Sequence, residues 1–306
     1  MASSPGLLPA WWQTGLVGDG SPDAGVSESA WAAPAPPLRG LVAWYTGYRQ
    51  EGVPPASHRG LPSPYLTMII TLDDPLVIAR HPDPATAPGC YPTLIGGLHT
   101  SSALITHDGR QSGAQVGLSP LGARALLGLP AGELANIDVD GTEVLGGTAR
   151  EWHERLRQAA SWPARFAILD ELLLARADPD QRVSRDVAAA WRLLVGSGGV
   201  IRVSAVAEQV GWSPRYLRRR LLAETGLTPK SAARVARFDR ARRLLQRQAR
   251  AGQPSALADL AAACGYYDQA HLAREFRELA GCPPSAWLAE EFRNVQAIPD
   301  PATEES

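Results

Sequence analysis

The sequence lacks the features that would place the protein in a membrane or outside the cell. It has no run of about eighteen or more apolar residues, and no basic N-terminal segment followed by an apolar one, so neither a transmembrane helix nor a signal peptide is predicted. It also has only three cysteines, Cys90, Cys264 and Cys282, at wide and irregular spacing. Such spacing is typical of reduced thiols, not of disulfide pairs or a zinc site. We therefore expect a cytoplasmic protein with no structural metal or cofactor, and a silent, partly buried thiol at Cys90.

Charge is nearly balanced overall but is distributed unevenly along the chain. The 306 residues have a formal net charge of -1. Residues 201–250 contain 13 arginines and lysines against 3 acidic residues, whereas residues 1–200 contain 14 basic and 19 acidic residues. The region after residue 200 is therefore suited to bind an anion. A hydrophobic fraction of 45% is sufficient for ordinary packed cores, and the length allows two compact domains with tails.

The N-terminal part is predicted to be a disordered tail followed by a β-rich domain. Residues 1–38 are rich in Ala, Pro, Gly and Ser, which bury too little apolar surface to offset the entropy of ordering. Residues 39–120 contain short β-branched and aromatic runs separated by turn residues, as in an antiparallel barrel or sandwich. The candidate strands are 41–48, 65–72, 76–79, 91–98, 103–107 and 115–118.

A helical extension over 121–197 is predicted to connect this domain to the rest of the chain. Helices are expected over 147–160, 163–176 and 184–195. The run from Gly196 to Gly199 consists of glycine and serine, which restrict the backbone little. We therefore predict a flexible joint and a domain boundary at this run.

The stretch after this joint has the residue spacing of a helix-turn-helix. Its key positions are Ala207, Gly211, Ser213, Pro214, Leu217 and Leu221. The alanine lets two helices cross closely, the glycine permits the tight turn, the serine and proline begin the second helix, and the leucines face the core.

The same pattern returns 54 to 55 residues later, which indicates an internal duplication. The matching positions are Ala261, Gly265, Asp268, Leu272, Phe276, Gly281 and Pro284. Between the two copies, residues 231–250 contain no proline and are predicted to form one long helix. The predicted fold class is therefore α+β: an N-terminal antiparallel β barrel or sandwich with a helical extension, then an all-α domain over 198–294 with two helix-turn-helix units joined by a long helix. Residues 295–306 are expected to be a C-terminal tail.

These two motifs and the arginine-rich helix between them resemble the AraC/XylS family of regulators. The resemblance implies two recognition helices in successive major grooves of DNA, with a rigid linker helix between them. Residues 92–129 are similar to the cupin-like sensor domains that members of that family carry. We therefore predict a sequence-specific DNA-binding transcription regulator that is not an enzyme and is controlled through its N-terminal domain. The expected partner is double-stranded DNA, and the further candidates are a small-molecule effector, RNA polymerase and a second copy of the chain.

Helical geometry indicates which side chains face the DNA. On a helix that begins at Pro214, Leu217 and Leu221 mark the buried face, while Arg215 and Arg219 lie away from it and Arg218 flanks them. Arginine can pair bidentately with guanine and also binds phosphate. The candidate DNA-contacting residues are Arg215, Arg218, Arg219, Gln269, His271, Arg274 and Arg277 on the two reading helices, and Lys230, Ser231 and Arg234 at the start of the linker helix. We expect more base discrimination from the first unit and more positioning from the second. A place on the surface, or pairing within the domain, is expected for Arg237, Arg240, Arg242 and Arg243.

Two roles for the N-terminal domain remain open at the level of sequence. A sensor of a small apolar or amphipathic molecule needs an enclosed apolar pocket in the sheet over 40–118, whereas a domain for dimerisation or partner contact needs an exposed apolar face. A metal-dependent cupin enzyme has little support, because the histidines at 58, 81, 99, 107 and 153 form no His-x-His or His-x3-His pair.

Overall fold

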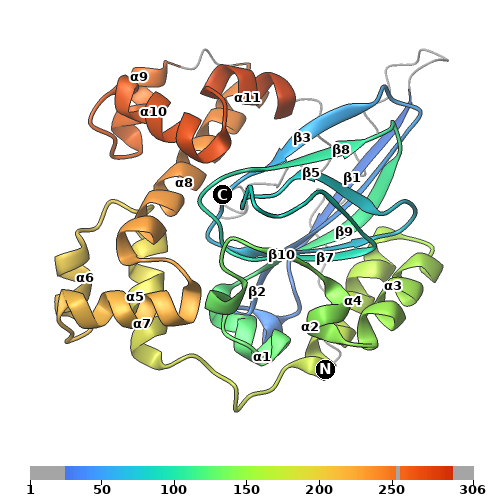
Figure 1. Ribbon diagram of the computed structural model, residues 1–306, viewed down its shortest axis with the longest axis horizontal. Coiled ribbons are helices and arrows are strands. Elements are labelled where there is room, and N and C mark those ends of the chain that lie inside the picture. Colours follow the sequence, from blue (N-terminus) through green and yellow to red (C-terminus); the bar gives the residue numbers. More distant parts are fainter. Residues whose placement is uncertain (1–24, 253–255, 292–306) are drawn as a thin grey trace, which may run out of the picture.

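Two antiparallel β-sheets form the N-terminal half of the computed structural model, which describes residues 25–252 and 256–291 (Figure 1). One sheet has the strand order β1 (Val26–Ala32), β2 (Val42–Glu51), β9 (Gln111–Leu118), β4 (Leu66–Thr71), β7 (Thr93–Gly96) and β10 (Asp138–Asp140). The other has the order β3 (Ala56–Gly60), β8 (Ala103–His107), β5 (Leu76–Arg80) and β6 (Gly89–Tyr91). Neighbouring strands are antiparallel in both sheets, which confirms the predicted sheet type.

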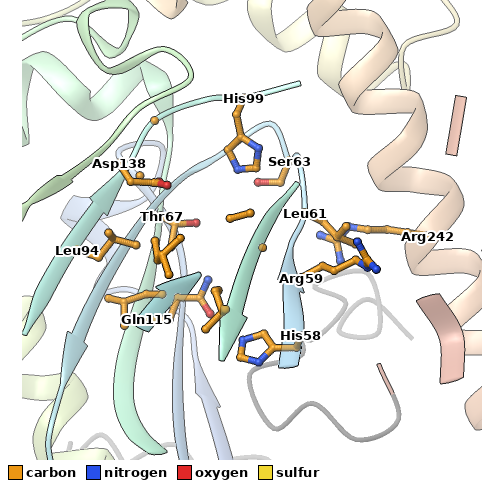
Figure 2. Close-up of a pocket in the computed structure, with 17 residues that line it drawn as sticks. His58, Arg59, Leu61, Ser63, Thr67, Leu94, His99, Gln115, Asp138 and Arg242 are labelled. Carbon is orange, nitrogen blue, oxygen red and sulfur yellow. The ribbon is translucent and has the colours of Figure 1, made fainter. Parts of the chain in front are cut away.

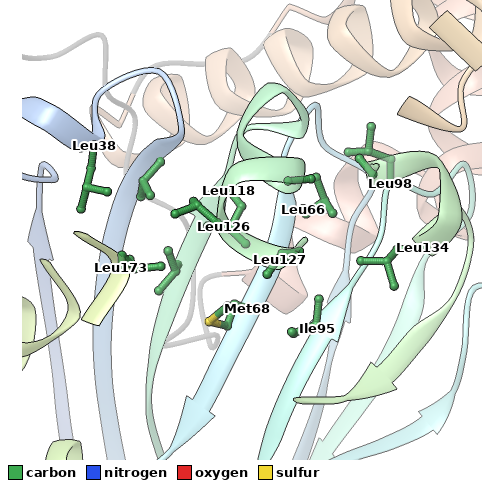
Figure 3. Close-up of a cluster of buried hydrophobic side chains, with 14 of the residues drawn as sticks. Leu38, Leu66, Met68, Ile95, Leu98, Leu118, Leu126, Leu127, Leu134 and Leu173 are labelled. Atoms are coloured by element: carbon green, nitrogen blue, oxygen red, sulfur yellow. The ribbon is translucent and has the colours of Figure 1, made fainter. Parts of the chain in front are cut away.

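The larger sheet is covered on both faces. On β4, Met68 and Ile70 pack into the core shared with the helices, whereas Ile69 packs into the core between the two sheets. Alternation of side chains along a strand explains this division. Because both faces are covered, every residue of β9 is buried. Figure 3 shows the core on the helix side, with leucines from the sheet and from the helices pointing toward one another.

Helices cover the outer face of this sheet. They are the short helices η1 (Pro36–Leu38), η2 (Pro120–Gly122), α1 (Ala123–Leu127), η3 (Ala131–Leu134) and α2 (Gly141–Leu145), and the longer α3 (Thr148–Gln158) and α4 (Trp162–Arg176). The last two confirm the helices predicted over 147–160 and 163–176. Asp170 of α4 accepts hydrogen bonds from Tyr45 Oη at 2.9 Å and from the Ala35 amide at 2.8 Å, so α4 is fixed to β2 and η1.

The C-terminal half is entirely helical. Its helices are α5 (Arg185–Gly196), α6 (Val203–Gln209), α7 (Pro214–Thr225), α8 (Pro229–Arg250), α9 (Leu257–Ala263), α10 (Gln269–Ala280) and α11 (Pro284–Glu291). The pairs α6–α7 and α9–α10 are the two helix-turn-helix units, and α8 is the long helix that joins them (Figure 1). The predicted order of elements is therefore confirmed, with α8 beginning two residues earlier than the prediction.

The predicted tail over 1–38 is wrong for its described part. Residues 26–32 form β1, which pairs with β2 along its whole length. Main-chain hydrogen bonds to the edge of β2 order this segment, although its side chains bury little apolar surface. The β-domain also extends past the predicted end at residue 120, because β10 pairs with β7. Residues 1–24 and the predicted C-terminal tail over 295–306 lie outside the described residues.

The predicted flexible joint over 196–199 is a packed turn. The backbone of Gly199 has a φ of +74° and lies so close to α8 that a Cβ atom would collide with Ala233 O. Helix α5, which the prediction assigned to the N-terminal extension, packs against α6, α7 and α8 and buries Trp191. The connection between the two halves is therefore the segment over 177–184, which precedes α5.

Candidate DNA-binding surface

The first helix-turn-helix unit has the local features that its sequence predicts. The hydroxyl of Ser213 accepts a hydrogen bond from the Tyr216 amide at 3.2 Å and so caps the N-terminus of α7. Gly211 in the turn has a φ of +70°, which a residue with a side chain rarely adopts. Leu217 and Leu221 are fully buried. These contacts fix α7 with the opposite face toward solvent.

The second unit repeats this construction. Asp268 caps α10 by accepting a hydrogen bond from the His271 amide at 2.6 Å. Gly265 has a φ of +74°, and Leu272 and Phe276 are buried. The predicted duplication is therefore present in the backbone, the caps and the core of both units.

The exposed face of α7 is strongly cationic. Arg215, Arg218 and Arg219 are exposed, and no ion pair with any of them occurs within the described residues. The Arg219 guanidinium lies 5.0 Å from the centre of the Tyr216 ring, and this ring contacts Trp212 edge to face at 5.0 Å. The two aromatic side chains therefore hold one cation in place. Tyr216 was not among the residues predicted from the sequence, although its position three residues before an arginine on a helix was a usable signal.

The exposed face of α10 is less charged. Gln269, Arg274 and Arg277 are exposed, as predicted for DNA-contacting side chains. His271 is half-buried, and its Nδ1 atom accepts a hydrogen bond from the Tyr267 amide at 3.3 Å. The side chain of Tyr267, which the sequence did not single out, is 93% exposed just before the helix.

The start of α8 differs in part from the prediction. Thr228 caps the helix, since its hydroxyl accepts a hydrogen bond from the Ser231 amide at 3.1 Å, and Lys230 is exposed. Arg234 is not a free cation, because it pairs with Glu275 at 3.1 Å and also with Glu278. The expectation that Arg234 is available to clamp phosphate is therefore revised. In this structure it holds α10 against α8.

Glu275 is the centre of this contact between α8 and α10. Besides Arg234, its carboxylate lies 3.4 Å from Arg237 and 3.8 Å from His271 Nε2. The Arg237 guanidinium also lies 5.1 Å from the centre of the Tyr266 ring. The prediction of an intradomain role for Arg237 thus agrees with its contacts. The same holds for the arginines at 242 and 243, which both pair with an aspartate one turn earlier on α8.

Comparison with protein families matches two parts of the chain. A family model described as a helix-turn-helix domain matches residues 206–290, which include both units and α8. Residues 206–290 are an AraC-type helix-turn-helix domain. A second model, described as a domain of unknown function (DUF6597), matches residues 31–140 of the β-domain. No curated protein gives a significant match to the chain.

Several solved structures are similar to the chain at low identity. ToxT from Vibrio cholerae O395 has 11% sequence identity, with 82% of this chain and 97% of that chain covered and a TM-score of 0.46. A probable AraC family transcriptional regulator from Rhodopseudomonas palustris CGA009 has 24% identity over 35% of this chain and 96% of that chain, with a TM-score of 0.31. The DNA-binding domain of AdpA, solved in complex with a target DNA, has 24% identity over 37% of this chain and 100% of that chain, with a TM-score of 0.32.

Beside the AraC-type domain, the β-domain has a small, partly open cavity between its two sheets. The cavity has a volume of about 80 Å³, well below the range of about 300–1,000 Å³ that is usual for ligand pockets (Figure 2). Its polar lining comes from His58, Arg59, Ser63, Thr67, His99, Gln115, Asp138 and Arg242. Within the described residues, the buried Oε1 atom of Gln115 has no hydrogen-bond partner. Burial lowers the pKa of His99, and this effect outweighs the nearby Asp138 carboxylate, which raises it. The His99 ring that faces this cavity is therefore neutral.

The remaining sequence predictions concern thiols, metals and membranes. Cys90 is exposed, so the expectation of partial burial is wrong, while Cys264 and Cys282 are buried and burial raises the pKa of both thiols. All three are free cysteines.

In the part of the chain that the structure describes, no three His, Cys, Asp or Glu side chains are grouped closely enough to hold a metal ion. No helix over 25–252 or 256–291 has the length and apolar character needed to cross a membrane.

Proposed function

We propose that the protein is a sequence-specific DNA-binding transcription regulator that reads base edges mainly with α7 of its AraC-type domain. The observation that carries the proposal is the set of exposed guanidinium groups of Arg215, Arg218 and Arg219 on the outer face of a capped helix. Arginine is the side chain best suited to guanine O6 and N7 in the major groove. Their lack of ion-pair partners among the described residues leaves these groups available for bases or phosphates.

The length of α8 supports the use of both units on one DNA molecule. Its 22 residues correspond to about 33 Å at 1.5 Å per residue. Successive major grooves on one side of B-DNA are about 34 Å apart. We assign Gln269, His271, Arg274 and Arg277 to the second groove, where fewer long cationic side chains favour positioning over base discrimination. Lys230 and Ser231 are assigned to a phosphate near the start of α8.

The test is a selection of bound duplexes from a random-sequence pool with the full-length protein, followed by measurement of affinity against salt. We expect one enriched motif with two half-sites, and an affinity that falls steeply with salt because cations displace condensed counterions. A full-length protein that shifts no duplex at low salt would contradict the proposed function. Binding without any enriched sequence would contradict its sequence-specific part.

For the N-terminal domain, we propose the role of a sensor of a small polar molecule. The cavity in Figure 2 supports this role, since the unpartnered Gln115 Oε1 atom and the neutral His99 ring lie on its wall. Its small volume, and the polar groups set among apolar side chains such as Ile78 and Leu94, favour such a molecule over the apolar or amphipathic effector expected from sequence.

Small polar compounds that bind there should raise the melting temperature of the wild-type protein and have a weaker effect on Gln115→Leu. If no compound distinguishes the two proteins, the domain serves dimerisation or partner contact instead. RNA polymerase and a second copy of the chain stay predicted partners.

A further inference from the structure

The two helix-turn-helix units are attached to the β-domain in different ways. The buried residues of the first unit, including Val206, Leu217 and Leu221, belong to the same continuous core as the six-stranded sheet. The second unit has a core of its own, built around Phe276 and Trp287. Because hydrophobic burial dominates the stability of such contacts, the first unit is fixed to the β-domain more firmly than the second.

Close backbone approach strengthens the attachment of the first unit. Gly132 of η3 lies against the C-terminal end of α7, where a Cβ atom on it would come within 2.6 Å of Ala223 O. Beside this contact, Arg124 forms a two-bond ion pair with Glu224 of α7, with distances of 2.6 and 3.1 Å. The ion pair therefore adds to a contact that apolar packing already maintains.

The second unit is held mainly by polar contacts at the C-terminal end of α10 and on α11. Arg59 of β3 donates to both carboxylate oxygens of Glu290, at 2.7 and 3.2 Å, and to Ala280 O at 3.2 Å. The hydroxyl of Ser102 donates to the same carbonyl at 2.9 Å. A Cβ atom on Gly281 would lie 3.1 and 3.3 Å from these two donor groups, so the glycine permits their approach.

The Arg59 contact is largely shielded from solvent. The side chains of Arg59 and Glu290 are 15% and 27% exposed, and the hydrogen bonds to Glu290 raise the pKa of the Arg59 guanidinium. Leu61 adds one partly buried apolar contact to the core of the second unit. The cavity between the sheets is also lined by Arg59, Leu61 and Arg242 of α8 (Figure 2). The same side chains therefore contribute to the cavity and to the contact with the second unit.

We propose that Arg59 and Ser102 form a latch that holds the second helix-turn-helix unit on the β-domain, and that opening the latch changes the tilt of this unit alone. The proposal rests on the proposed function, because the consequence appears in DNA reading. With the latch closed, the two reading helices have one separation and therefore fit one spacing of half-sites. With the latch open, the second unit is held through α8 and the single apolar contact of Leu61, and a wider range of spacings fits.

The first test measures amide hydrogen exchange of the full-length protein without DNA. In Arg59→Gln, amides at the C-terminal end of α10 and in α11 should exchange about tenfold faster than in the wild-type protein. A tenfold change corresponds to a loss of roughly 1.4 kcal/mol of local protection.

Two control variants remove ion pairs of the same two-bond geometry. Arg124→Gln breaks the pair on α7 and should leave exchange of α7 nearly unchanged, because the apolar core persists. Arg110→Gln breaks the exposed pair with Asp74, both residues of which belong to the β-domain, and should change neither unit.

The second test compares DNA duplexes whose half-sites are moved apart or together by one or two base pairs. The wild-type protein should prefer one spacing, and Arg59→Gln should reduce that preference by about fivefold or more, since a flexible unit loses the selectivity of a fixed one. Glu290→Gln opens the same latch from the other side and should reproduce both effects, which guards against misfolding of a single variant.

Unchanged exchange in both latch variants would overturn the proposal, and so would faster exchange with an unchanged spacing preference. If the wild-type protein binds no DNA, the proposed function fails, while the exchange experiment still decides whether the latch exists.

Discussion

Arg219 differs from the neighbouring arginines because an aromatic side chain already holds it in place. The ring of Tyr216 lies beneath its guanidinium, and Trp212 contacts that ring edge to face. A cation over an exposed ring gains about 0.5–1 kcal/mol, and the contact restricts a side chain that otherwise has many rotamers. Binding to a base then costs less entropy. Arg234, by contrast, is occupied by two carboxylates and has less freedom to reach DNA.

We expect Arg219→Ala to separate folding from DNA reading. The side chain is exposed, so its removal should change the free energy of unfolding by less than about 1 kcal/mol. Loss of a base contact should weaken specific binding by about 1–3 kcal/mol and relax the preference at one base pair. Arg220→Ala is the matched control, because Arg220 is exposed on the same helix but is not assigned to the DNA. Equal affinity and equal base preference in Arg219→Ala and wild type would show that α7 is not the reading helix.

Tyr216 should act on DNA through the position of Arg219. Tyr216→Phe keeps the ring and should bind DNA with nearly wild-type affinity, whereas Tyr216→Ala should weaken specific binding by about 0.5–1 kcal/mol. A double-mutant cycle with Arg219→Ala measures the coupling between the two side chains. Additive losses in that cycle would mean that the ring contributes independently of the arginine.

At the scale of elements, the sequence predicted best those whose signals are local. Helices α7 and α10 each have a cap, a turn glycine and core residues within about a dozen positions, and their caps are formed by Ser213 and Asp268 as expected. Strands β1, β3, β6 and β10 were missed, because pairing with other strands orders them. Propensity within a short window contains no information on such pairing.

The candidate site shows the same limit. Helical periodicity was sufficient to place the arginines of α7 on an exposed face, because that face is defined by the helix itself. It gave no indication that Arg234 pairs with carboxylates 41 and 44 residues further along the chain. It also missed the pairing of Arg59 with Glu290, which are 231 residues apart. Contacts between elements depend on tertiary packing, and no pattern within one element encodes them.

Replacement of Glu275 tests how α10 is held on α8. Glu275→Gln leaves Arg234 and Arg237 without their shared carboxylate, so we expect the free energy of unfolding to fall by about 1–3 kcal/mol. Arg237, which then has no carboxylate partner, should also make DNA binding more dependent on salt. The slope of affinity against salt should steepen by about the amount that one phosphate contact contributes. Glu278→Gln is the control: its side chain is 64% exposed, and it should cost less than about 0.5 kcal/mol. Chemical denaturation and salt titrations measure both effects, and an equal cost for the two variants would contradict the central role of Glu275.

At the scale of the whole molecule, the structural boundary does not coincide with the glycine-rich run in the sequence. Helix α5 precedes that run, yet it packs on α6, α7 and α8. The connection over 177–184 leads from the helices beneath the sheet to α5 on the other side of the molecule (Figure 1). The helix-turn-helix region is therefore built on α5, and a fragment chosen from the sequence pattern would cut through its core.

Two fragments with the same C-terminus test this boundary. A fragment over 183–294 retains α5, whereas a fragment over 198–294 loses the buried side chains of Val187, Trp191 and Leu194. Removal of one large buried side chain costs about 3–5 kcal/mol, which is comparable to the whole stability of a small domain. The longer fragment should therefore unfold in one cooperative thermal transition, and the shorter one should lack such a transition or melt at a much lower temperature. Trp191→Ala in the longer fragment should cause most of the same loss. If the shorter fragment melts as cooperatively and at the same temperature as the longer one, α5 is not part of the DNA-binding domain and the boundary lies at the glycines after all.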